Sequence, residues 1–273
     1  MQLMDTVSTY LDPIRNLAEF AGETILQVYQ TDFVVKTKSD KTPVTEADIA
    51  ANKIIVAGLK SLTPNIPVIS EEQGIAPFTE RQTWSRYWLV DPLDGTREFI
   101  QKNGEFTVNI ALIENQQPIL GVVYAPDLRL MYYAIRGQGS FKIDNGNNPE
   151  KITVNESCQN PIRVTGSRSF TSNDFINFIR KLPECSVINL GSALKSCLVA
   201  EGGADIYPRF GLTSEWDTAA TQCILEEAGG CLVDLNLKPL RYNTKESLLN
   251  PHFLAYGDSN MDWAMYCTEQ QTK

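Results

Sequence analysis

The most informative segment of the sequence is Tyr87–Thr96, which reads YWLVDPLDGT. Its first residues are almost wholly apolar, which predicts a strand over 87–91 that is buried on both faces. Asp91 stands at the carboxyl end of that strand, where open α/β sheets place their ligands. We expect Pro92 to stop the strand ladder and Gly95 to allow a tight turn, so that Asp91 and Asp94 can converge on one point.

The paired carboxylates have two possible explanations. Two buried anions repel each other and are costly to bury unless a cation accompanies them. Oxygen-only ligation favours Mg²⁺ or Mn²⁺ over zinc. Alternatively, Asp91 and Asp94 form an Asx turn, in which their side chains only accept hydrogen bonds from nearby backbone N–H groups. The segment alone leaves both open.

Three further acidic sites occupy comparable places in the chain: Glu71 with Glu72, Asp48, and Asp217. The two glutamates follow a predicted strand at 67–70, and each aspartate lies in the first turn of a predicted helix. Solvated loop charges would explain the glutamates, and capping or helix-dipole roles would explain the aspartates. Each site taken alone is open to that simpler explanation.

The remaining pattern predicts an α/β (α+β) fold with an antiparallel N-terminal sheet and a smaller C-terminal α/β sheet. Asp12-Pro13 is interpreted as the N-cap and first residue of a helix, and Thr45, with Asp48 as capping partner, begins a helix that ends near Leu62. Alternation over 107–135 predicts an antiparallel meander. Strands near 162–165 and 186–189 are predicted to alternate with helices near 173–181, 192–201 and 216–228.

Composition and charge exclude several classes of protein. At about 100–200 residues per domain, 273 residues allow one large domain or two small ones. A chain of this length can fold without disulfides or a structural metal. Its 24 basic and 33 acidic residues give a net charge of −9, which opposes binding to nucleic acid or to anionic lipid. A small anion can still bind where cations are placed locally.

The cysteines indicate the cellular compartment, and the single histidine excludes several classes of enzyme. None of the six cysteines forms a CxxC pair, so we expect free thiols in a reducing compartment and a cytoplasmic protein. We expect no signal peptide in residues 1–12 and no membrane span. His252 is the only histidine, which argues against HExxH metalloproteases and most Ser-His-Asp hydrolases.

Taken together, the acidic segments resemble the inositol monophosphatase superfamily of lithium-sensitive, magnesium-dependent phosphomonoesterases. The resemblance rests on Ser70-Glu71-Glu72, on residues 91–96 and on the downstream segment 216–220, WDTAA. Longer segments resemble the bacterial 3′(2′),5′-bisphosphate nucleotidases of the CysQ type. These segments are 39–52 (SDKTPVTEADIAAN), 86–113 (RYWLVDPLDGTREFIQKNGEFTVNIALI), 118–126 (PILGVVYAP) and 198–211 (LVAEGGADIYPRFG).

The resemblance implies a layered αβαβα sandwich of the inositol monophosphatase and fructose bisphosphatase type. An N-terminal subdomain, 1–150, would hold most metal ligands. A C-terminal subdomain, 151–273, would supply Asp217 and the nucleotide contacts, with the active site at the interface. Our boundary rests on the polar stretch within 145–160.

The resemblance also implies a set of metal ligands. Glu71, Asp91 and the main-chain carbonyl of Leu93 would hold one Mg²⁺. Asp91, Asp94 and Asp217 would hold a second, with Asp91 bridging the two ions. Glu71 would also help to hold a third, largely hydrated ion. Mn²⁺ could substitute for Mg²⁺, and Li⁺ is the expected inhibitor.

The same resemblance assigns the catalytic and phosphate-binding groups. Thr96, supported by Asp48 and with Glu71 nearby, would orient and deprotonate the attacking water. The backbone N–H groups of Gly95 and Thr96 would bind the phosphate. The residues implied to contact the substrate are Glu71, Leu93, Asp94, Gly95, Thr96, Ser192, Lys195, Arg209 and Asp217.

Two further segments, 191–195 (GSALK) and 207–211 (YPRFG), resemble those that hold the nucleotide. On that likeness Ser192, Lys195 and Arg209 would contact the nucleotide and its uncleaved phosphate, because Arg binds phosphate bidentately and Lys adds a point charge. The simpler explanations are a solvated helix charge for the lysine and a surface ion pair for the arginine.

One position departs from the pattern of the relatives. Phe170 stands where they often have His, so contacts to the nucleotide can differ here. Its ring could stack on a base or pack against the protein.

The expected reaction is hydrolysis of the 3′-phosphate of adenosine 3′,5′-bisphosphate (PAP) to AMP and phosphate. 3′-Phosphoadenylyl sulfate (PAPS) is a further expected substrate, and sulfate assimilation is the expected context. The alternatives are an inositol or sugar monophosphatase and, in another class, a non-catalytic nucleotide- or metal-binding regulatory module. Some relatives are placed at the cytoplasmic face of the inner membrane, but no basic amphipathic helix or anchor motif supports that here.

Overall fold

Helix α1, Gln2–Tyr29, begins well before the predicted N-cap, so the prediction that Asp12 caps it is wrong. Pro13 lies inside the helix. The apolar stripe continues on its N-terminal side, since Val7 is buried in the same core as Ile14. Packing of that face outweighs the local cost of a proline in a helix. The computed structural model describes residues 2–37, 43–169 and 172–267.

The remaining helices follow the predicted order closely. The second helix begins after Thr45, which caps it through Asp48 as predicted, and it ends at Leu62. The bounds are α2 Glu46–Leu62, α3 Phe78–Arg81, α4 Thr96–Ile100, α5 Asn173–Lys181, α6 Leu194–Ala200, α7 Glu215–Glu227 and the 3₁₀ helix η1 Trp263–Tyr266.

The larger sheet has seven strands in the order β3-β4-β5-β6-β7-β8-β9. Strands β3 and β4 are parallel, and every later pair is antiparallel, so the predicted meander is confirmed. The bounds are β3 Val68–Ser70, β4 Arg86–Asp94, β5 Thr107–Glu114, β6 Gln117–Ala125, β7 Leu130–Ile135, β8 Gly139–Asp144 and β9 Glu150–Ile152. A separate two-stranded ladder joins β1 Lys36–Thr37 to β2 Pro43–Val44.

The smaller sheet has five strands in the order β11-β10-β12-β14-β13. Strand β10 runs parallel to both of its neighbours, and the other pairs are antiparallel. The bounds are β10 Ile162–Ser167, β11 Cys185–Leu190, β12 Ile206–Arg209, β13 Cys231–Asp234 and β14 Phe253–Tyr256.

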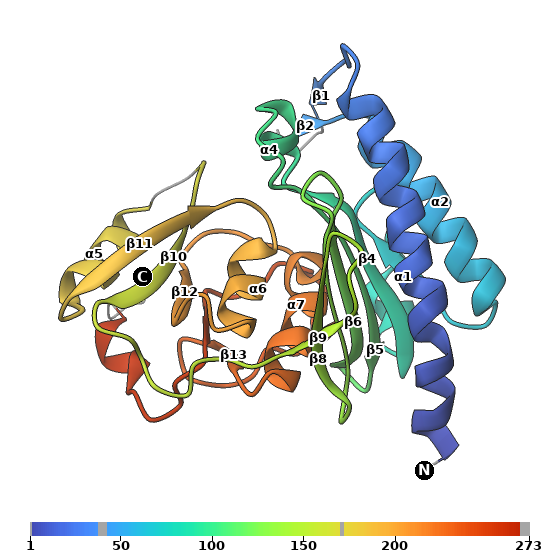
Figure 1. Cartoon of the computed structure of the whole chain (residues 1–273). Helices are drawn as coiled ribbons and strands as arrows, with labels where there is room; N and C mark the ends of the chain where they lie inside the picture. Colours follow the sequence, from blue (N-terminus) through green and yellow to red (C-terminus); the bar gives the residue numbers. More distant parts are fainter. Residues whose placement is uncertain (1, 38–42, 170–171, 268–273) are drawn as a thin grey trace.

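Three buried clusters hold five layers together (Figure 1). Helices α1 and α2 pack on one face of the larger sheet, and α6 and α7 lie between the two sheets. Helix α5 and η1 contribute Phe178 and Trp263 to the outer face of the smaller sheet. The layered αβαβα sandwich is therefore confirmed.

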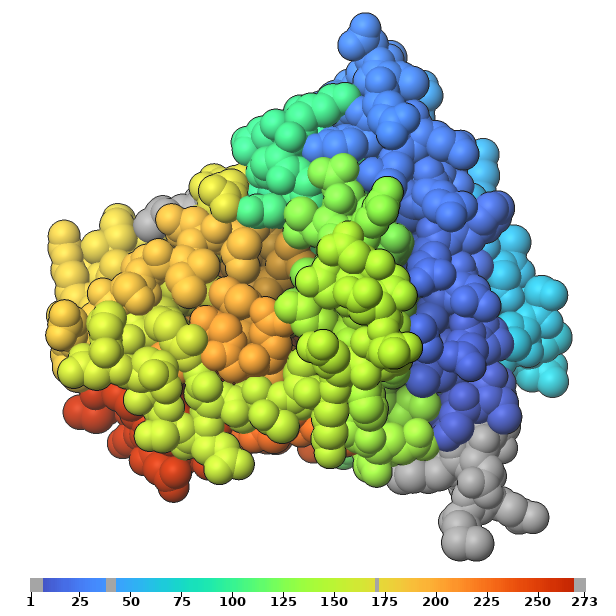
Figure 2. All heavy atoms as spheres, in the orientation of Figure 1, coloured from blue at the N-terminus to red at the C-terminus, as the bar shows by residue number. Residues whose placement is uncertain are grey.

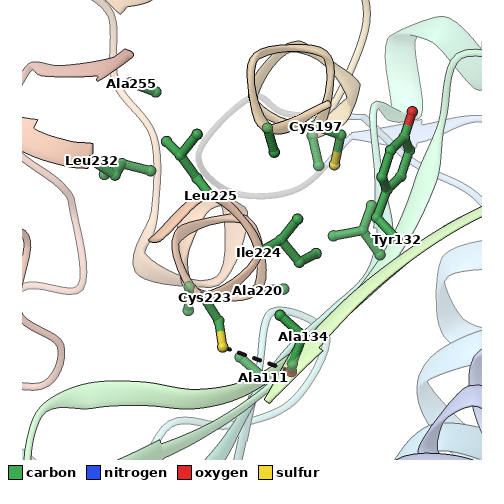
Figure 3. Close-up of a cluster of buried hydrophobic side chains, with 14 of the residues drawn as sticks. Ala111, Tyr132, Ala134, Cys197, Ala220, Cys223, Ile224, Leu225, Leu232 and Ala255 are labelled. Atoms are coloured by element: carbon green, nitrogen blue, oxygen red, sulfur yellow. Dashed lines mark hydrogen bonds between the residues drawn. The ribbon is translucent and has the colours of Figure 1, made fainter. Parts of the chain in front are cut away.

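Helix α7 is pressed tightly between the sheets. A Cβ atom at Gly121 would lie 2.4 Å from the carbonyl oxygen of Ala220, so only glycine allows this approach. In Figure 3, Cys223 faces the larger sheet, with its Sγ 3.7 Å from the carbonyl oxygen of Ala134, while Leu225 faces the smaller sheet. Helix α7 therefore contacts both sheets.

The chain leaves the larger sheet after β9 and enters the smaller one at β10. Figure 2 shows the C-terminal part, yellow to red, packed against the N-terminal part, blue to green. One continuous core contains residues of both sheets and of α6 and α7. The division into subdomains 1–150 and 151–273 stays a prediction. Within the described ranges, no helix is long and apolar enough to cross a bilayer.

Candidate active site

Strand β4 ends differently from the prediction. It continues through Pro92 to Asp94 instead of stopping at the proline. Its ladder with β5 shifts register between Asp91 and Asp94, because proline cannot donate to the ladder but the flanking residues still pair. Gly95 then adopts a φ of +87° and leads into α4, as the turn prediction requires. The two carboxylates are thus separated by a bulge.

Asp91 lies at the centre of the acidic group. Its side chain is buried, and Oδ1 accepts a hydrogen bond of 3.1 Å from the backbone N–H of Leu93, so an Asx-type contact is present. Burial raises the pKa of Asp91 well above its ordinary value, and the negative charges of Glu71, Asp94 and Asp217 raise it further. Carboxylates from distant parts of the sequence therefore lie within electrostatic reach of one another.

Glu71 and Glu72 follow β3 at the edge of this group. The backbone N–H of Glu71 donates to the carbonyl of Val90 at 3.2 Å, which fixes the turn beside β4. The carbonyl of Glu72 accepts a hydrogen bond from Asn52, whose side chain also accepts one from Ser70. Both glutamates are half-buried, so they are not simply solvated loop charges.

Asp217 lies in the first turn of α7. Its Oδ2 accepts a hydrogen bond of 2.9 Å from the backbone N–H of Ser214, so the predicted capping role is confirmed. Burial raises the pKa of Asp217 well above its usual range, and the charge of Asp94 raises it further, while Ser214 and Arg209 oppose the rise. The side chain of Asp217 therefore both caps α7 and belongs to the acidic group.

Thr96 and Asp48 are brought together as the resemblance implies. The hydroxyl of Thr96 donates to Oδ1 of Asp48 at 3.1 Å. The other oxygen, Oδ2, accepts from both the backbone N–H and the hydroxyl of Thr45, at 2.8 Å and 2.6 Å. Burial raises the pKa of Asp48, and these hydrogen bonds oppose the rise. Asp48 is thus a fixed, buried carboxylate with one oxygen directed at Thr96.

Ser192, just before α6, lies next to Asp94, and Lys195 lies in the first turn of α6. Ser192 donates its hydroxyl to Oδ2 of Asp94 at 2.7 Å. Lys195 is buried, with its Nζ 2.6 Å from the carbonyl of Ser192 and 5.4 Å from the ring centre of Tyr207. A solvated helix charge is therefore the wrong explanation for Lys195. It forms no ion pair with any residue that the structure describes.

Arg209 ends β12 next to a small pocket. Its Nη2 donates to the carbonyl of Leu212 at 3.1 Å, and it forms no ion pair within the described residues, so the surface ion pair is also not observed. The pocket is lined by Ser167, Ser172, Phe175 and residues 207–211. Phe170, the position that departs from the relatives, lies outside the described residues.

The candidate metal ligands are near one another without forming a closed cluster. Among the described residues, no group of three or more His, Cys, Asp or Glu side chains is arranged to hold a metal ion. The donor types still fit Mg²⁺, because four carboxylates and the Leu93 carbonyl are all oxygen ligands. Asp91 is buried, the other three carboxylates are half-buried, and negative charges that lie this close together are stabilised by a cation. The metal-ligand assignments remain predictions.

Sequence reasoning missed a group of polar residues around Asp94 and Ser192. Thr107 and Asn109, both buried on β5, contact Ser192 and Asp94. Glu105 accepts hydrogen bonds from the Gly191 N–H and the Arg168 guanidinium. The available signal was the pair of polar residues at positions 107 and 109 in a strand whose next four residues are apolar, since a buried polar side chain requires a partner.

The family model described as "Inositol monophosphatase family" matches residues 7–265. The chain belongs to the inositol monophosphatase family. Within it, the chain is 50% identical over 245 residues to the 3′(2′),5′-bisphosphate nucleotidase CysQ of Salmonella typhimurium, covering 89% of this chain and 98% of the relative. It is 49% identical over 246 residues to the CysQ of Escherichia coli strain K12, with the same coverage.

A solved structure supports the same grouping. The CysQ structure from Bacteroides thetaiotaomicron, described as a bacterial member of the inositol monophosphatase family, aligns with a TM-score of 0.80. The two chains are 39% identical, and the alignment covers 92% of this chain and 97% of that one. The resemblance to the CysQ type that the sequence motifs predicted is confirmed, and the relatives are named 3′(2′),5′-bisphosphate nucleotidases.

Proposed function

We propose that this chain is a Mg²⁺-dependent phosphomonoesterase that hydrolyses the 3′-phosphate of adenosine 3′,5′-bisphosphate, giving AMP and phosphate. The observation that supports it most is the buried acidic group around Asp91, which lies beside the hydrogen-bonded pair Thr96–Asp48. Relatives named 3′(2′),5′-bisphosphate nucleotidase at 49–50% identity support the substrate class. The 3′-phosphate of PAPS is the second proposed target, with sulfate assimilation as the context.

Glu71, Asp91, Asp94 and Asp217, with the Leu93 carbonyl, are the proposed Mg²⁺ ligands. Bound metal ions would neutralise the substrate's charge and activate water for an in-line displacement. A phosphomonoester carries about two negative charges near neutral pH, so an acidic protein needs local cations to bind it. Most of the required ligand oxygens already lie on rigid elements, at the end of β4 and the start of α7.

Thr96 and Asp48 are the proposed groups that handle the proton of the attacking water. Because the Thr96 proton points at Oδ1 of Asp48, the hydroxyl oxygen is free to accept a hydrogen bond from water. The raised pKa of Asp48 makes it a better proton acceptor than an ordinary carboxylate. Thr45 fixes Asp48 from the far side, so this orientation does not depend on the substrate.

Lys195 and Arg209 are the proposed contacts for the second, uncleaved phosphate. A buried ammonium without a carboxylate partner is costly, and an anionic ligand would relieve that cost. Arg209 can present two parallel N–H donors to a phosphate. With Ser192 they would distinguish a bisphosphate from a simple monophosphate.

The first experiment compares phosphate release from PAP, inositol 1-phosphate and AMP in the presence of Mg²⁺. A large preference for PAP is expected, and AMP serves as the matched compound that lacks the 3′-phosphate. Preference for inositol 1-phosphate would replace this proposal with an inositol or sugar monophosphatase. Ligand-dependent thermal stabilisation with no release from any compound would indicate a non-catalytic binding module.

The second experiment tests the nucleotide pocket with Arg209→Ala. We expect hydrolysis of PAP to fall much more, by about ten- to a hundredfold, than hydrolysis of inositol 1-phosphate. Arg180→Ala, which removes an exposed arginine at the end of α5, is the matched control and should change neither activity. Equal losses on both substrates would overturn the nucleotide assignment.

Two further parts of the proposal follow from the family resemblance. Mn²⁺ should replace Mg²⁺ in the assay, and Li⁺ should inhibit. A cytoplasmic location is proposed on chemical grounds, since all six cysteines are free thiols.

A further inference from the structure

Asp94 is held by hydrogen bonds to one of its two carboxylate oxygens. The Ser192 hydroxyl donates to Oδ2 at 2.7 Å, and the Asn109 side-chain amide lies 3.5 Å from the same oxygen. No described residue donates a hydrogen bond to Oδ1. Among the described residues, Oδ2 of Asp94 is therefore the hydrogen-bonded oxygen, and its shorter hydrogen bond comes from Ser192.

Thr107 contacts both Ser192 and Asn109, the two residues that approach Oδ2 of Asp94. It is fully buried on β5, and its Cα is the ladder partner of Asp94 on β4. Its Oγ1 lies 2.5 Å from the hydroxyl oxygen of Ser192 and 2.9 Å from Oδ1 of Asn109. None of the roles proposed above uses Thr107 or Asn109.

The number of hydroxyl protons determines which group donates in each of these hydrogen bonds. Ser192 has a single hydroxyl proton, and the 2.7 Å hydrogen bond that it donates to Oδ2 of Asp94 uses that proton. The single Thr107 proton then serves both remaining acceptors, the hydroxyl oxygen of Ser192 and Oδ1 of Asn109. Thr107 thus contacts both residues that approach Oδ2 of Asp94, and of these Ser192 makes the shorter hydrogen bond.

Ser192 needs this support because its own conformation is unusual. Its φ is +54°, in the left-handed region that non-glycine residues seldom adopt. Its carbonyl also accepts the Lys195 ammonium at 2.6 Å. The residue thus joins the acidic group on one side to the buried cation on the other.

We propose that Thr107 is a positioning residue that sets the orientation of the Asp94 carboxylate through Ser192. The hydroxyl of Thr107 fixes the Ser192 hydroxyl, and Ser192 then occupies Oδ2 of Asp94 so that Oδ1 is left for a divalent cation. This inference rests on the proposed metal role of Asp94. It assigns a function to a buried hydroxyl that touches neither substrate nor metal.

The test replaces the Thr107 hydroxyl by a methyl group of similar shape, in Thr107→Val. Mn²⁺ binding to the full chain without substrate is measured by titration calorimetry. The affinity should fall about tenfold, the usual lower range for loss of a group that supports a metal ligand. With PAP as substrate, kcat should fall by a similar factor and KM should change less, because Lys195 and Arg209, the proposed contacts of the second phosphate, are not altered.

Two variants separate positioning from packing. Thr107→Ser keeps the hydroxyl and should restore most of the Mn²⁺ affinity. Thr165→Val makes the same chemical change at another fully buried strand threonine, whose hydroxyl has no partner in the described structure, and should leave Mn²⁺ affinity unchanged. Circular dichroism confirms that each variant is folded before titration.

The outcomes distinguish this inference from the proposed function. Unchanged Mn²⁺ affinity in folded Thr107→Val, or equal losses in Thr107→Val and Thr107→Ser, would overturn the positioning role. A wild-type chain that binds no Mn²⁺ would overturn it as well. If Mn²⁺ affinity falls in Thr107→Val while the wild-type chain hydrolyses no phosphomonoester, the positioning role stands and the proposed function fails.

Discussion

Two helices that begin with the same capping pattern contribute to the candidate site. Their aspartates differ in the contact that the second carboxylate oxygen makes. Asp48 in α2 and Asp217 in α7 are each the third residue of their helix, and each accepts the backbone N–H of the cap residue, Thr45 or Ser214. Asp48 uses its second oxygen to accept the Thr96 hydroxyl. No described residue donates a hydrogen bond to the second oxygen of Asp217.

The difference shows that a capping role and a chemical role are not alternatives. The cap fixes one oxygen of each carboxylate and so directs the other. At Asp48 that oxygen meets a hydroxyl, which suits proton transfer, whereas the Asp217 carboxylate lies within electrostatic reach of Asp94 and Glu71, which suits a cation. One local device thus yields a candidate base and a candidate metal ligand.

The largest effect is expected from Asp217→Asn. The amide oxygen can still accept the Ser214 N–H, so the start of α7 should survive while the metal-binding charge is lost. We expect activity to fall by more than about a thousandfold and Mn²⁺ affinity to fall with it. Phosphate release and calorimetry measure the two. Near-normal turnover would remove Asp217 from the metal site.

Asp48→Asn should show that Asp48 and Asp217 have different roles, because it should impair proton transfer without removing a metal ligand. We expect kcat to fall by about a hundred- to a thousandfold, the range for loss of a general base, with Mn²⁺ affinity unchanged. Thr96→Val should give a similar loss, and the double variant should lose little more, since the two act as a unit. A large drop in Mn²⁺ affinity in Asp48→Asn would show that the two capped aspartates share one role.

The capped helix starts were predictable because their determinants are local. Thr45 and Asp48 are three residues apart, and the predicted end at Leu62 is the observed one. The start of α1 was not predictable from Asp12-Pro13, since burial of Val7 in a core built from distant strands extends the helix. Local chemistry fixed the first boundary and tertiary packing the second.

The site was predictable in its residue types and less so in its environment. The acidic residues came from motifs, and the structure places their charges near one another. The burial of Lys195 depends on how α6 packs beside Tyr207, which no local pattern reveals. The contact between Thr107 and Ser192 joins residues 85 positions apart, so it depends on how the segment before α6 packs against β5.

A smaller effect concerns the pH dependence of stability in the metal-free protein. The folded-state pKa values of Asp48, Asp91 and Asp217 are all raised, so the folded state holds more protons than the unfolded one. Their favourable contribution is complete below about pH 4 and is lost as the pH rises through the raised values. Tm in EDTA should therefore fall by several degrees between pH 5 and pH 8, and Mg²⁺ should reverse the fall.

Asp94→Asn should change the contribution of Asp217, but not that of Asp48, to the pH dependence of Tm in EDTA. Removing the Asp94 charge lowers the pKa of Asp217, which that charge raises, whereas the raised pKa of Asp48 comes mainly from burial. The variant should lose activity yet be more stable than wild type in EDTA at pH 8, with a flatter pH profile. Asp12→Asn, at an exposed carboxylate, is the control. A metal-free wild type that is more stable at pH 8 than at pH 5 would contradict the expected direction of the pH dependence.

The smallest effect is expected from Thr45→Ala, which weakens the cap of Asp48 without removing it. The hydroxyl of Thr45 accepts from Ala47 and donates to Asp48, while the backbone N–H of Thr45 holds the same carboxylate independently. Loss of the hydroxyl should cost about 1 kcal/mol, seen as a fall of about 2–4 °C in Tm. Activity should fall only a few-fold, and Thr45→Ser should restore both. If Thr45→Ala instead loses as much activity as Asp48→Asn, the hydroxyl rather than the backbone N–H directs Asp48 at Thr96, and the cap of α2 is itself part of the proton-transfer machinery.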